Sequence, residues 1–107
     1  MKFDSIKAEI KKLALETTRI DNGEYFEAVI RSACLEEMVR ALESIFGTPV
    51  WPSDDKLPKD AQALIRSVGG LRKGQTLYFL NNEGSSAFAM LWPWQDGERI
   101  TIKISKI

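Results

Sequence analysis

The sequence predicts an α+β fold of two layers, with three helices on one face of a mostly antiparallel four-stranded sheet. Three segments repeat apolar residues at spacings of three and four, which is typical of amphipathic helices. A segment near the amino terminus is rich in aromatic and β-branched residues, as strands are. The last third of the chain holds three more such segments separated by turn formers, which predicts a three-stranded meander.

The first helix and the first strand are predicted from the amino-terminal third of the chain. The helix has one apolar face, formed by Phe3, Ile6, Ile10 and Leu13. Asp21-Asn22-Gly23 is expected to end it, because Asn and Gly tolerate the left-handed conformation that closes a helix. Residues 24–30 follow as a strand, since Tyr25, Phe26, Val29 and Ile30 are crowded into this short segment.

Two further helices are predicted on either side of a proline-rich segment. The second helix has an apolar stripe that ends at Gly47 and consists of Leu35, Met38, Val39, Leu42, Ile45 and Phe46. Residues 48–58 carry three prolines and should wrap the surface, held in place by Trp51. A third, short helix begins at Pro58 and ends at Gly69-Gly70, with Ala61, Leu64, Ile65 and Val68 on its apolar face.

The meander consists of strands predicted over residues 75–80, 86–94 and 98–107. In the last strand isoleucines alternate with polar residues, so one of its faces should pack on a core and the other should meet water. The middle strand is apolar on both faces, and Pro93 must lie at a bulge, an edge or an end because it lacks an N–H. The element order is therefore helix, strand, helix, helix, strand, strand, strand, in one domain spanning residues 1–107.

Composition argues against most enzyme classes and against metal or cofactor chemistry. The chain has no histidine, the side chain that most often titrates near neutral pH and the commonest metal ligand. Its single cysteine, Cys34, can form neither an internal disulfide nor a cysteine-based metal site. No apolar run of signal-peptide or membrane-spanning length starts the chain, so we expect a cytoplasmic protein without a membrane partner.

Aromatic residues are the best functional candidates. They are Trp51 in the proline-rich segment, Tyr78 on the first meander strand, and Trp92 and Trp94 beside the Asp96-Gly97 turn. Tryptophan and tyrosine are enriched at interface hot spots, although packing in the core would also explain these rings. Arg72 and Lys73, which follow the third helix, are further candidates, either as neutralisers of its carboxyl end or as binding residues.

These observations predict a non-enzymatic domain that binds another protein or itself, through a tryptophan-bearing rim or a free strand edge. The final strand could provide that edge, since it runs to the last residue. One alternative is single-stranded nucleic acid stacked on Tyr78, Trp92 or Trp94, against which the zero net charge argues. Another is a small-ligand pocket walled by the same aromatic residues.

Overall fold

The computed structural model describes residues 3–13, 15–51, 66, 74–82 and 85–106, without the side chains of residues 81, 82 and 85. It confirms the α+β class. The elements in chain order are α1 (Phe3–Lys11), β1 (Thr17–Asp21), β2 (Tyr25–Arg31), the short 3-10 helix η1 (Ser32–Cys34), α2 (Leu35–Phe46), β3 (Thr76–Asn82), β4 (Ser85–Pro93) and β5 (Arg99–Lys106).

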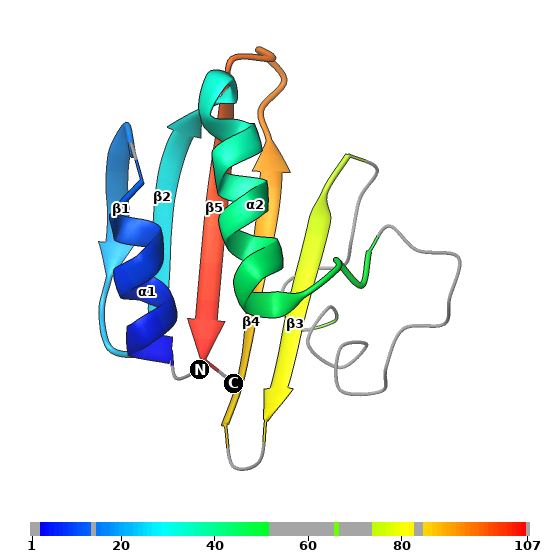
Figure 1. Ribbon diagram of the computed structural model, residues 1–107. Coiled ribbons are helices and arrows are strands. Elements are labelled where there is room, and N and C mark those ends of the chain that lie inside the picture. Colours follow the sequence, from blue (N-terminus) through cyan, green and yellow to red (C-terminus); the bar gives the residue numbers. More distant parts are fainter. Residues whose placement is uncertain (1–2, 14, 52–65, 67–73, 83–84, 107) are drawn as a thin grey trace.

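The sheet has five strands in the order β1-β2-β5-β4-β3, and every neighbouring pair is antiparallel (Figure 1). The meander of β3, β4 and β5 is confirmed. The final strand, however, does not provide a free edge, because β5 lies between β2 and β4. At the centre of the sheet Ile102 is opposite Ala28 on one side and Leu91 on the other. The outer strand at one end is β1.

The prediction of four strands was wrong, because the first helix is shorter than its sequence pattern suggested. It ends at Lys11, and residues 17–21 form β1 instead of continuing towards the turn. The Asn22-Gly23 turn therefore joins two strands: the Asn22 side-chain oxygen accepts hydrogen bonds from the backbone N–H groups of Glu24 and Tyr25. The predicted helix over residues 58–68 lies, apart from Arg66, outside the described residues.

Both described helices lie on the same face of the sheet, α1 over β1 and β2, and α2 over β5 and β4 (Figure 1). Their apolar sides and the strand residues that face them form the main core. Its fully buried members include Ile6, Ile10, Leu42, Ile102 and Ile104. The second helix begins and ends as predicted, with Gly47 adopting a φ of 81° after its last turn. No helix in the described part of the chain is long and apolar enough to cross a membrane.

The opposite face of the sheet is covered over one half. There Leu77, Phe88 and Met90 are buried in a second cluster, and Trp51 packs on them. The Trp51 segment is also joined to β3 by backbone hydrogen bonds, since Leu77 N–H donates to the Trp51 carbonyl at 3.0 Å. Over β1, β2 and β5 no described element covers this face. We call this uncovered half the open half-face.

Candidate functional site

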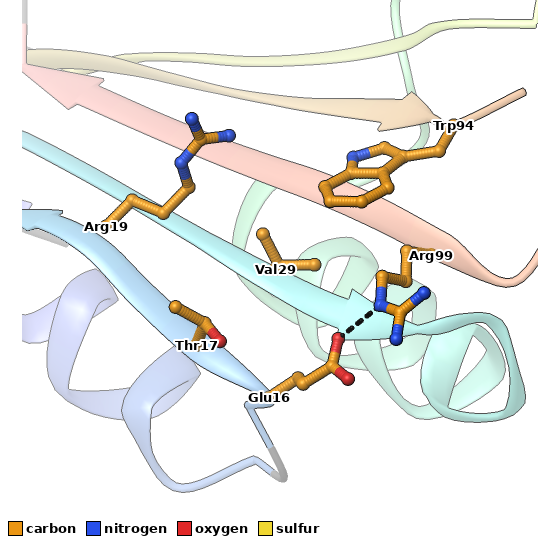
Figure 2. Close-up of a pocket in the computed structure, with 6 residues that line it drawn as sticks. All are labelled: Glu16, Thr17, Arg19, Val29, Trp94 and Arg99. Atoms are coloured by element: carbon orange, nitrogen blue, oxygen red, sulfur yellow. Dashed lines mark hydrogen bonds and ion pairs between the residues drawn. The ribbon is translucent and has the colours of Figure 1, made fainter. Parts of the chain in front are cut away.

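The open half-face contains a hollow of about 430 Å³. We call it the open-face hollow and define it by its lining residues, which are Glu16, Thr17, Arg19, Val29, Trp94 and Arg99 (Figure 2). In Figure 2 the helices lie behind the sheet, Val29 is in the middle, and Trp94 stands on the opposite side of it from Thr17. The hollow thus crosses three strands, from the outer strand β1 to the chain beyond β4.

Strand register explains why these side chains meet. Thr17 is opposite Val29, and Val29 is opposite Thr101, so the three form a row across β1, β2 and β5. Successive side chains along a strand point to opposite faces of the sheet. The residues before and after each member of this row face the helices, so the row itself lies on the open half-face. The register then shifts between Thr18 and Ile20, where Arg19 is the extra residue of a bulge. The bulge places both Arg19 and Ile20 near Glu27.

Trp94 is held by the turn between β4 and β5. Its backbone N–H donates to the Arg99 carbonyl at 2.9 Å, and its indole Nε1 donates to the Thr101 hydroxyl at 2.7 Å. Gly97 allows the turn because its φ is 70°. Hydrogen bonds from the Glu98 and Arg99 backbone N–H groups lower the pKa of Asp96, which keeps this carboxylate charged as the acceptor of the turn. The ring is therefore fixed in orientation while 39% of the residue stays exposed.

An ion pair closes the end of the hollow near the turn. Arg99 Nε donates to a Glu16 carboxylate oxygen at 2.9 Å (Figure 2). The Arg31 guanidinium lies 3.4 Å from the other oxygen. The Glu16 carboxylate raises the pKa of Arg99, and Asp96 adds to this effect. Arg99 also lies 5.9 Å from the Trp94 ring centroid, within the range of a cation–π contact. The charges at this end are thus mutually neutralised.

A second charged group lies beside the hollow and is centred on Glu27. Its carboxylate accepts a hydrogen bond from the Tyr25 hydroxyl at 2.6 Å and lies 3.5 Å from Arg19 Nε. Burial and then Glu27 raise the pKa of Tyr25, so the phenol remains a donor. Lys103 lies 4.0 Å from Glu27 and stands over the Trp92 ring, 3.6 Å from its centroid. Trp92 is opposite Thr101 in the strand register and continues the same row on β4, with the Lys103 cation over its ring.

The structure brings only one of the candidate aromatic residues into the hollow. That residue is Trp94. Trp92 is half-buried beneath Lys103, and Trp51 packs on the covered half of the same face. Tyr78 points to the other side of the sheet, where it is 1% exposed and packs near Phe46, so it is a core residue. Arg72 and Lys73 lie outside the described residues.

Sequence reasoning missed most of the lining. The sequence pattern predicts a first helix that continues to Asp21-Asn22-Gly23, so it gives no sign that Glu16, Thr17 and Arg19 lie on a strand, and it identifies Val29 only as a strand residue. The signal for β1 was present in the neighbouring threonines 17 and 18 and in Ile20, which are β-branched and precede an Asn-Gly turn. No sequence pattern, however, shows that β5 inserts beside β2 and brings Arg99 and Trp94 next to them.

The lining supplies an aromatic ring, an aliphatic floor, one ion pair and one further guanidinium. These are groups that hold a ligand by contact area, stacking and charge. Among the described residues no cluster of three or more metal-ligating side chains is present. Comparisons with protein-family models, with curated proteins and with solved structures found no match to this chain.

Proposed function

We propose that this chain is a non-enzymatic protein-binding domain that holds a segment of its partner on the open half-face. The observation that carries the proposal is an oriented, exposed tryptophan beside a hollow, on the part of the sheet that no described element covers. Such a ring gives a large contact area at small entropic cost, because Thr101 and the turn already fix it. Rigid aromatic anchors of this kind dominate the binding energy of many interfaces.

The distribution of exposed apolar side chains supports the same surface. Ile20, at 40%, and Trp94, at 39%, are the exposed large hydrophobic residues of the described chain. Ile20 is opposite Glu27 in the strand register, and Glu27 lies on the open half-face. Both residues therefore belong to one face, one near each side of the hollow. Apolar groups gathered on one face, with charged residues around them, are typical of a contact surface.

The positions of the aromatic rings favour a protein partner over single-stranded nucleic acid. Stacking of successive bases needs several rings along one exposed groove. Here Tyr78 is buried under the helices, and Trp92 is covered by Lys103, so Trp94 is the ring of that set that faces outward. Self-association through the outer edge of β1 is also disfavoured, because this strand is short and carries a bulge.

The test is a selection of random peptides displayed on phage against the immobilised wild-type domain. Enriched peptides are then measured against Trp94→Ala and against Arg40→Gln, a control on the exposed side of α2. We expect Trp94→Ala to weaken binding by about tenfold or more, as removal of an interface tryptophan does. Arg40→Gln should leave the affinity unchanged.

Three results would contradict the proposal. One is a selection that enriches no peptide, and another is a set of peptides that bind the Trp94→Ala variant as tightly as the wild type. The third is binding of a fluorescent oligothymidine that is lost in Trp94→Ala, which would assign the ring to nucleic acid instead. If the partner is a second copy of this chain, equilibrium sedimentation of the wild type should show a dimer, and Trp94→Ala should dissociate that dimer.

A further inference from the structure

We infer that the open-face hollow selects an acidic segment, in which a large apolar side chain and a carboxylate stand two positions apart. The inference rests on the proposed function and adds the chemistry of the partner. In this arrangement the apolar side chain packs on the exposed part of the Trp94 ring, above the buried Val29, and the carboxylate pairs with Arg19. The argument depends on which charged groups of the lining are already neutralised.

Arg19 is the cation of the lining whose donors are left available. Its side chain is 54% exposed, and its contact with Glu27 is made through Nε at 3.5 Å. In the described part of the chain, Glu27 is the carboxylate within ion-pair distance of Arg19. Figure 2 shows this guanidinium standing clear of the Glu16–Arg99 pair. A planar guanidinium with free donors binds a carboxylate through two parallel hydrogen bonds.

The remaining charges of the lining do not compete for such a carboxylate. Glu16 is held between Arg99 and Arg31, so it is neutralised and does not repel an incoming acid strongly. Arg99 is in turn engaged by Glu16 and by Asp96, at 2.9 and 3.4 Å. Beside the lining, Arg19 and Lys103 share the single carboxylate of Glu27, so this group of three carries a net positive charge, and Arg19 is its more exposed cation. Charge complementarity therefore favours an acidic partner.

The spacing of the two groups follows from strand geometry. Arg19 belongs to β1, and the Trp94 ring is hydrogen-bonded to Thr101 of β5. Strand β2 lies between β1 and β5. Two inter-strand steps amount to about 10 Å. In an extended peptide, side chains two positions apart lie on the same side and about 7 Å from each other. The long Arg19 side chain spans the difference, so this spacing fits both groups at once.

The experiment uses fluorescent peptides with a Gly/Ser host sequence that contains Phe and Glu two positions apart. A matched peptide carries Gln in place of Glu. Binding is measured by fluorescence anisotropy on the wild type, on Arg19→Gln, and on Arg40→Gln, which removes an exposed arginine from the helix layer. We expect the change from Glu to Gln in the peptide to weaken binding to the wild type by about tenfold. On Arg19→Gln the two peptides should differ by less than about twofold.

Equal affinity of the two peptides for the wild type would overturn the inference, as would an undiminished difference on Arg19→Gln. Failure of both peptides to bind would also overturn it. These results leave the proposed function to be judged by the random-peptide selection. Peptides from that selection that depend on Trp94 but carry no acidic residue would refute the inference alone.

Discussion

The hydrogen bond between the Trp94 indole and the Thr101 hydroxyl should be measurable as a coupling free energy. Thr101 is 6% exposed, and the two atoms are 2.7 Å apart. Such a bond contributes about 0.5–1.5 kcal/mol net to folding. The lower part of this range applies where the donor can form a hydrogen bond with water once the acceptor is removed. Because 39% of Trp94 is exposed, we expect about 0.5–1 kcal/mol.

A double-mutant cycle isolates this bond. Thr101→Val keeps the side-chain shape and removes the acceptor, while Trp94→Phe keeps an aromatic ring and removes the donor. We expect Thr101→Val to lower the free energy of unfolding more in the wild type than in the Trp94→Phe background. The difference between the two losses is the coupling free energy of about 0.5–1 kcal/mol. A loss of 1 kcal/mol corresponds to about 4 °C in melting temperature for a chain of this length.

Urea denaturation followed by circular dichroism provides the four stabilities of the cycle. The Thr101→Val variant should also show greater rotational freedom of Trp94, measured as lower anisotropy of its emission after subtraction of the Trp94→Phe signal. A coupling below about 0.3 kcal/mol would refute the reasoning, because unconnected substitutions usually add within such a margin. The ring would then not be fixed in advance of binding.

Three further predictions concern the framework that positions the hollow. Ile102→Ala, at the fully buried centre of β5, should lower the free energy of unfolding by about 2–5 kcal/mol in urea denaturation, and a loss below 1 kcal/mol would contradict the central placement of this strand. Hydrogen bonds from Lys11 and Lys7 hold the pKa of Asp21 below its ordinary 3.8, so their contribution to stability is present above that pH and is lost as the pH falls through the lowered pKa. The melting temperature of Asp21→Asn should therefore be below that of the wild type at neutral pH and equal to it in strong acid. A difference in melting temperature that persists in acid would exclude the ion pairs as its cause. Gly97→Ala places a side chain at a φ of 70° and should cost about 1 kcal/mol in the same denaturation assay; an unchanged stability would show that the turn relaxes freely.

Much of the fold follows from local pattern. The apolar stripe that includes Leu42 set the bounds of α2, and alternation around Ile102 identified the last strand and its buried face. Pro93, which was expected at a bulge, an edge or an end, is the last residue of β4. The error arose where two signals competed. Asn22-Gly23 can close a helix or a hairpin, and only the pairing of residues 17–21 with β2 decides between them.

The candidate site could be predicted only in part, because it depends on contacts between residues far apart in the sequence. Trp94 was identified from its residue type and from the proline before it. Arg19 became part of the site through a bulge, and Arg99 through the insertion of β5 beside β2. Tyr78 shows the converse. Its strand was correctly predicted, but the side on which each residue of β3 lies depends on register, and register buries this ring beneath α2.

The most direct test of the open half-face as the contact surface is a nuclear magnetic resonance titration with a selected peptide. Each of the three tryptophans contributes one indole N–H signal, and these report on the hollow, on the Lys103-covered ring and on the covered half of the sheet. The account predicts that the Trp94 signal and the Val29 methyl signals shift together, while the Trp51 indole stays in place. Shifts confined to α1 and α2, with the Trp94 indole unmoved at saturation, would contradict it.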